Sequence, residues 1–69
     1  MPLSMMGVGT RHKIKSVRGD DAVRKHLGSL GFTEGIFVEI IADMDGSLIL
    51  GVMDSRVAVD KSLAMRILV

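Results

Sequence analysis

The sequence predicts a mainly β fold, a small closed barrel of five strands with one short helix between strands one and two. Three observations predict it. Short runs of Ile, Val and Leu alternate with polar residues through most of the chain, as in half-buried strands. Turns rich in glycine or aspartate separate these runs, and only residues 22–30 show the apolar spacing of a helix. Closure into a barrel would hide sheet edges that otherwise invite aggregation.

The first half of the chain predicts one strand followed by the helix. Residues 11–17 form the strand, which is polar over much of its surface. Asp20 or Asp21 caps the helix, because either carboxylate can accept hydrogen bonds from its first free amides. The helix has one apolar stripe, formed by Val23, Leu27 and Leu30. Gly31 lies just beyond it, where a left-handed residue commonly ends a helix.

The second half of the chain predicts consecutive hairpins. Asp45-Gly46 is a strong signal for a tight turn between strands, and Asp54-Ser55 marks a second turn. A single helical turn, capped by Asp60, is expected over residues 60–64. The strands are expected at residues 36–43, 48–53, 56–59 and 65–69. With the inserted helix, this is the pattern of a five-stranded SH3-like barrel.

The alternation in these strands assigns side chains to two faces. The face predicted to fill the core carries Ile36, Val38, Ile40, Ala42, Leu48, Leu50 and Val52. Phe37, Ile41, Ile49 and Met53 then point the other way, where either the helix and N-terminal segment cover them or a partner does. Both alternatives are left open. The hypothesis for a partner interface comprises Leu30, Phe32, Phe37, Ile41 and Met53.

Length and composition limit the protein class. Sixty-nine residues make one domain, residues 1–69, and the absence of cysteine excludes disulfides and thiolate metal sites. No apolar run approaches a membrane span, and the N-terminus lacks the basic start of a secretory signal. A cytoplasmic location is expected.

Neither histidine suggests a metal centre. His12 and His26 lack a neighbouring ligand at helical spacing, and a dedicated iron or zinc site needs three or more converging ligands. Both are expected to be solvated. Asp43, Asp45 and Asp54 are explained by turn chemistry. No metal site and no cofactor are therefore predicted.

No set of residues in the sequence has the pattern of a known catalytic site. There is no Ser–His–acid ordering with a plausible nucleophile turn. Gly28, Gly31 and Gly35 imitate a phosphate-binding loop, but they follow a helix, whereas such a loop follows a strand and opens a helix. The protein is predicted not to be an enzyme.

The basic residues of the first half of the chain are predicted to form a solvated face. They are Arg11, Lys13, Lys15, Arg18, Arg24 and Lys25. A net charge of +1 is too small for a strong nucleic-acid surface, and the stacking aromatics of single-strand binders are missing. No nucleic acid is expected as a partner, although a nucleic-acid-binding barrel stays a third alternative that salt-dependent retention on DNA or RNA would test.

Glycines and aliphatics at fixed offsets resemble those of the FeoA family, cytoplasmic accessory proteins of bacterial ferrous iron uptake. The resemblance runs nearly end to end. It is carried by Leu3-Ser4, Gly9, Ile14, Val17, Leu27, Leu30-Gly31-Phe32, Gly35-Ile36, Val57-Ala58-Val59, Ala64 and Ile67-Leu68-Val69. It implies an SH3-like barrel that associates with the FeoB-type ferrous iron transporter on its cytoplasmic side. The protein would then be peripheral to the membrane through this partner only, and self-association is left open.

The same small barrel resembles the C-terminal domain of iron- and manganese-dependent repressors. A free-standing regulatory domain that binds a peptide or protein in metal-responsive transcription is therefore the alternative function. The chain begins with methionine and ends at the last expected strand, without a preceding helix-turn-helix segment. This favours the expectation of a stand-alone accessory protein.

Overall fold

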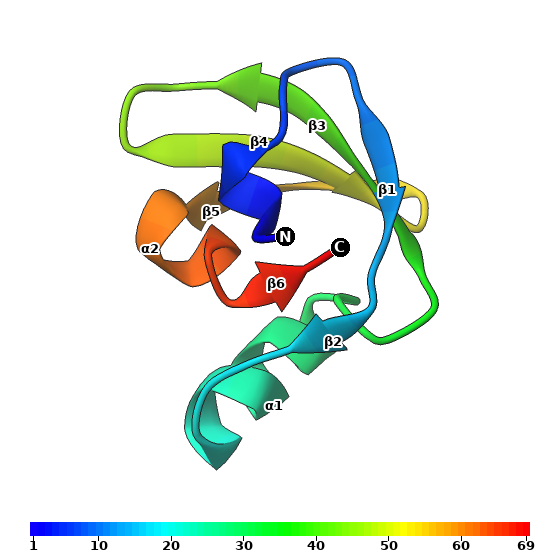
Figure 1. The fold of residues 1–69 in the computed structure, drawn as a ribbon, viewed down its shortest axis with the longest axis vertical. Coiled ribbons are helices and arrows are strands. Elements are labelled where there is room, and N and C mark those ends of the chain that lie inside the picture. The colour runs from blue at the N-terminus through cyan, green and yellow to red at the C-terminus, as the bar shows by residue number, and fades with distance from the viewer.

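A computed structural model describes all 69 residues and contains six strands in two antiparallel sheets (Figure 1). In chain order the elements are η1 (Leu3–Met5), β1 (Arg11–Lys13), β2 (Ser16–Val17), α1 (Asp21–Ser29), β3 (Phe37–Asp43), β4 (Ser47–Val52), β5 (Ser55–Asp60), α2 (Lys61–Ala64) and β6 (Ile67–Leu68). One sheet has the order β1-β3-β4-β5, and the other pairs β2 with β6. The mainly β class and the short helix are as predicted, but there are six strands where five were expected.

The predicted first strand is divided because its backbone changes partners. The amide of Ile14 donates to the carbonyl of Ile36, whereas the amide of Lys15 donates to the carbonyl of Leu68. The chain therefore leaves the four-stranded sheet and joins the small sheet within one residue. At this change the Ile14 side chain is 1% exposed and lies in the core. As a result, α1 follows the second strand of the chain rather than the first.

Helix α1 (Asp21–Ser29) begins and ends one residue earlier than the predicted range of residues 22–30. Asp20 is its cap, and its Oδ1 accepts a hydrogen bond from the amide of Val23 at 2.9 Å. At the other end Gly31 has φ +102°, and its amide donates to the carbonyl of Gly28. The amide of Phe32 donates to the carbonyl of Leu27, which completes a Schellman motif.

The long hairpin of β3 and β4 provides the centre of the core. Its inward side chains are Val38, Ile40, Leu48, Leu50 and Val52, as predicted. Ala42 is different, because the register shifts between Ile40 and Ala42 and leaves Ile41 as the extra residue of a β-bulge. Ala42 then pairs with the outward residue Ile49, so the prediction that it faces the core is wrong.

Twelve buried apolar side chains form one core, and no polar side chain is buried among them. The members outside β3 and β4 are Leu3, Ile14, Leu27, Phe32, Val59, Ala64 and Ile67. The two chain ends meet beside this core (Figure 1), where the amide of Val69 donates to the carbonyl of Met1. Neither helix has the length and apolarity needed to cross a bilayer.

Helix α2 lacks the cap that the sequence predicts. Asp60 precedes it, but its side chain accepts no hydrogen bond from the helix. The first helical amide, that of Lys61, instead donates to the carbonyl of Gly46 in the β3–β4 turn. This tertiary contact holds the start of α2, and only Asp20 acts as a side-chain cap.

Two glycine substitutions test the end of α1. Gly28 lies inside the helix with open space around an added Cβ, so Gly28→Ala should raise the free energy of unfolding by about 0.5–1 kcal/mol. Gly31→Ala should lower it by about 1–2 kcal/mol, because an L-residue is strained at positive φ. Urea unfolding measures both changes, and shifts of the same sign would contradict this assignment.

The two aspartates before the helices give a second matched test. Asp20→Ala should lower the free energy of unfolding by about 1 kcal/mol. The substitution removes the carboxylate that accepts a hydrogen bond from the amide of Val23. Asp60→Ala should change it by less than about 0.5 kcal/mol, since no cap bond is lost. Equal losses in thermal or urea unfolding would show that Asp60 caps α2 in solution.

Candidate interaction surface

Neither histidine lies in a group of three potential metal ligands. His12 is half-buried rather than fully solvated, and its Nε2 lies 2.8 Å from Oγ1 of Thr10. His26 is exposed on α1, as expected. Nowhere in the chain do three His, Asp or Glu side chains converge closely enough to hold one metal ion.

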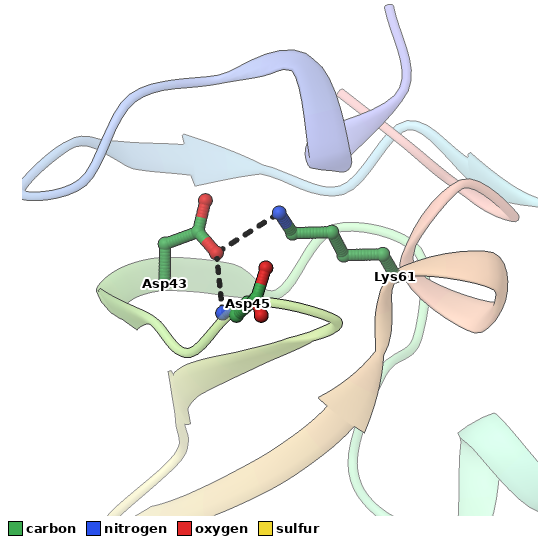
Figure 2. A network of polar contacts seen from close by, with 3 residues as sticks. All are labelled: Asp43, Asp45 and Lys61. Carbon is green, nitrogen blue, oxygen red and sulfur yellow. Dashed lines mark hydrogen bonds and ion pairs between the residues drawn. The ribbon is translucent and has the colours of Figure 1, made fainter.

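The β3–β4 turn holds the one ion pair of the molecule (Figure 2). Lys61 Nζ lies 2.9 Å from Oδ1 of Asp43, and the amide of Asp45 donates to the same oxygen at 3.3 Å. The hydrogen bond from Lys61 is the main cause that holds the pKa of Asp43 below its ordinary value. These interactions connect the turn to the first residue of α2. The Asp43 carboxylate is therefore explained by a structural role.

Two open depressions lie around the helix and the small sheet. The first, about 430 Å³, runs between α1 and β2 and carries Asp21, Arg24, Lys25 and Glu34 at its rim. The second, about 550 Å³, lies beside Ile14 and Gly35. The charges at the first balance one another and are all exposed, so it offers no buried polar group that would orient a small ligand.

Three predicted interface residues come from the end of α1, the start of β3 and the turn after β4, and we call Leu30, Phe37 and Met53 the turn-end cluster. Met53 Cγ lies 3.5 Å from the position of a Cβ on Gly31, directly after Leu30. Phe37 directly precedes Val38 and Met53 directly follows Val52, and these two valines are partners in the antiparallel pair of β3 and β4. Phe37 is 47% exposed and Met53 is 72% exposed, whereas Leu30 is half-buried against the core. Large apolar side chains therefore face solvent at this end.

Phe32 does not belong to that surface. Its side chain is 1% exposed, so its place in the interface hypothesis is corrected to a core position. The cause is the Schellman motif, in which the residue after the left-handed glycine packs back onto the last turn of the helix, here onto Leu27. That motif, readable from Leu27 and Gly31, is the signal that could have placed Phe32 inside.

Ile41, the fifth predicted residue, lies apart from the turn-end cluster on the outward side of the large sheet. It is half-buried, because its Cδ1 lies 3.1 Å from the position that a Cβ on Gly51 would take. Arg11 covers Phe37 on the same side, with its guanidinium carbon 4.4 Å from the ring centroid. That Arg11 and Ala42 share this face could not be predicted from alternation alone, because it depends on strand pairing and on the bulge.

The fold and surface define a class of protein, a small SH3-like domain with exposed apolar residues. Within that class the chain belongs to the FeoA family, whose domain model matches residues 1–69. The family is linked to ferrous iron transport. Comparison with curated proteins gives no match.

Solved structures of the family are similar over nearly the whole chain. An iron uptake regulatory protein, FeoA, is 31% identical with a TM-score of 0.90, and the match covers 97% of this chain and 91% of that chain. A zinc complex of FeoA from Stenotrophomonas maltophilia is 30% identical with a TM-score of 0.86, covering 99% of this chain and 87% of that chain. The latter is described as a prokaryotic SH3 domain protein.

The same fold occurs inside a larger regulator. A manganese-dependent transcriptional repressor is 14% identical with a TM-score of 0.88, and the match covers 97% of this chain and 39% of the repressor. At this identity the likeness shows the fold alone. The predicted similarity to repressor barrels is therefore confirmed at the level of architecture.

The Asp43–Lys61 pair predicts a pH dependence. Because the folded pKa of Asp43 is lowered, the pair stabilises the protein above the ordinary aspartate pKa, and this contribution is lost as pH falls through the lower folded value. Lys61→Met should raise the pKa of Asp43 towards its ordinary value, as followed by NMR titration of the carboxyl carbon. Lys15→Met, which removes an exposed lysine without a carboxylate partner, should leave it unchanged. An unchanged Asp43 titration in both variants would contradict the pairing.

Proposed function

We propose that this protein is a non-catalytic accessory factor of ferrous iron uptake that binds the cytoplasmic side of the FeoB-type transporter. The observation that carries the proposal is the FeoA domain match over the whole chain. The exposed turn-end cluster supports a role in protein contact, because large apolar side chains exposed together are typical of interaction sites.

The turn-end cluster has the composition of a contact that adapts to its partner. Met53 has a flexible, polarisable side chain, and Phe37 offers a large apolar area at a small cost in rotamer entropy. Met53 is also held at φ +55°, a backbone conformation that is uncommon for a residue other than glycine. The turn thus presents its side chain over Gly31 rather than into the core.

Such a module would influence the transporter by binding one of its conformations more tightly than another. A ligand shifts an equilibrium only by its difference in affinity for the two states, and no reactive group is required. Regulation of nucleotide hydrolysis or of gating would follow from that difference, with the chemistry left to the transporter.

A matched pair of methionines tests this proposal. Met53→Asp should weaken binding to the cytoplasmic region of the transporter by about tenfold or more, because it removes apolar burial worth roughly 1.5–3 kcal/mol. Met65→Asp makes the same chemical change at a residue 58% exposed after α2 and should leave binding unchanged. Aspartate tolerates the positive φ of residue 53, so Met53→Asp is expected to fold.

The pair is read by titration calorimetry, with circular dichroism to establish folding. Failure of the wild type to bind at tens of micromolar would overturn the proposed partner. Equal affinities for the two aspartate variants would instead remove the turn-end cluster from the contact.

A regulatory domain is the second candidate function, favoured by the shared fold with the manganese-dependent repressor. It would bind a peptide or protein of a transcription complex. A repressor gene beside this one, together with no binding to the transporter, would favour it. A neighbouring ferrous transporter gene favours the first proposal.

A further inference from the structure

The outward side of the four-stranded sheet forms a second surface, which we call the outer face. Both helices put their buried residues, Leu27 and Ala64, into the core on the other side of the sheet. In Figure 1 the sheet curves around η1 and β6, away from this face. Its members are Arg11, Lys13, Phe37, Glu39, Ile41, Ala42, Ile49, Gly51, Arg56 and Ala58.

Strand register arranges the outer face in rows across the sheet. Ala42 pairs with Ile49, and Ile49 pairs with Ala58, which gives a continuous apolar row over three strands. The bulge is responsible, because it turns Ala42 outward beside Ile41. Gly51 lets the Ile41 side chain lie flat over β4 instead of projecting. The centre of the face is therefore low and apolar.

Three cations lie in the rows next to this apolar row, and we call them the cationic frame. Arg11 and Lys13 extend from the edge strand β1, and Arg56 extends from the opposite edge strand β5. All three are exposed, and none has a carboxylate within 4.0 Å, since the one ion pair joins Lys61 to Asp43. Glu39 is the only acidic residue in their rows. Two cationic edges with an apolar row near them complement a segment of the opposite charge.

We propose that the outer face binds an acidic segment of the partner protein, with apolar side chains on the Ala42–Ile49–Ala58 row and carboxylates at Arg11, Lys13 and Arg56. This inference rests on the proposed function and names the chemistry of the transporter segment that is bound. Charged pairs at the two edges set the orientation of the segment and speed its association, while the apolar row excludes water.

The geometry argues against other anionic partners. A membrane surface is bound by apolar side chains that project between headgroups, whereas Ile41 lies flat on the sheet. Single-stranded nucleic acid stacks successive bases on several aromatic rings, whereas this face has one ring, Phe37, with the Arg11 guanidinium over one side of it. A protein segment uses both the cations and the apolar row.

Charge reversal on two faces tests the inference with the transporter. Lys13→Glu with Arg56→Glu should weaken binding of the cytoplasmic region about tenfold or more, and should flatten its dependence on salt between about 50 and 300 mM. Arg24→Glu with Lys25→Glu carries the same change in charge on exposed positions of α1 and should bind like the wild type. Equal weakening in both double variants would overturn the inference while leaving the proposed function intact.

A second arm tests the face independently of the transporter. The wild type and both double variants are titrated, by fluorescence anisotropy, with a short synthetic peptide of alternating glutamate and leucine and with its lysine–leucine counterpart. Only the glutamate peptide should bind, and only the outer-face variant should lose it. Vesicles containing phosphatidylglycerol and single-stranded DNA are the remaining probes. Binding of either one in place of the glutamate peptide, or no binding of that peptide, would overturn the inference.

Discussion

Two adjacent peptide groups, those of Ile14 and Lys15, connect the two sheets of this barrel. One amide donates to Ile36 at the entrance to β3, and the other donates to Leu68 in β6. With the Ile14 side chain buried between them, this change of partner brings both sheets over one core. It also fixes where the chain leaves for α1. The end of α1 then lies against the turn after β4, where Gly31 is next to Met53 of the turn-end cluster.

Local signals predicted much of this fold because they act over a few residues. The cap at Asp20, the stripe of Val23, Leu27 and Leu30, and the glycine stop at Gly31 are each satisfied within one helix. The inward residues of β3 and β4 follow from simple alternation up to Ile40. Beyond that residue the sequence still alternates, but the register with β4 shifts. The alternation of one strand does not reveal such a shift, because the shift depends on the register with the partner strand.

The candidate surface was predicted less completely than the fold. Phe37 and Met53 were singled out and are exposed, while Phe32 proved to be a core residue through the Schellman motif. Asp60 was predicted to cap α2, but its side chain accepts no hydrogen bond from the helix. The cationic frame of the outer face could not be foreseen, because Arg11 and Arg56 come from opposite edges of the sheet. Long-range pairing, rather than composition, decides which charges share a face.

No polar side chain is buried in the core of this small barrel, so its charged and polar groups lie at the surface. We propose that its effects depend on what this surface binds. Chemical-shift mapping of the labelled protein with the cytoplasmic region of the transporter tests which surface binds. We expect perturbed amides along the turn-end cluster and the outward residues of β3, β4 and β5, with α1 before Gly28 unaffected. Perturbations confined to the depression between α1 and β2 would contradict this expectation.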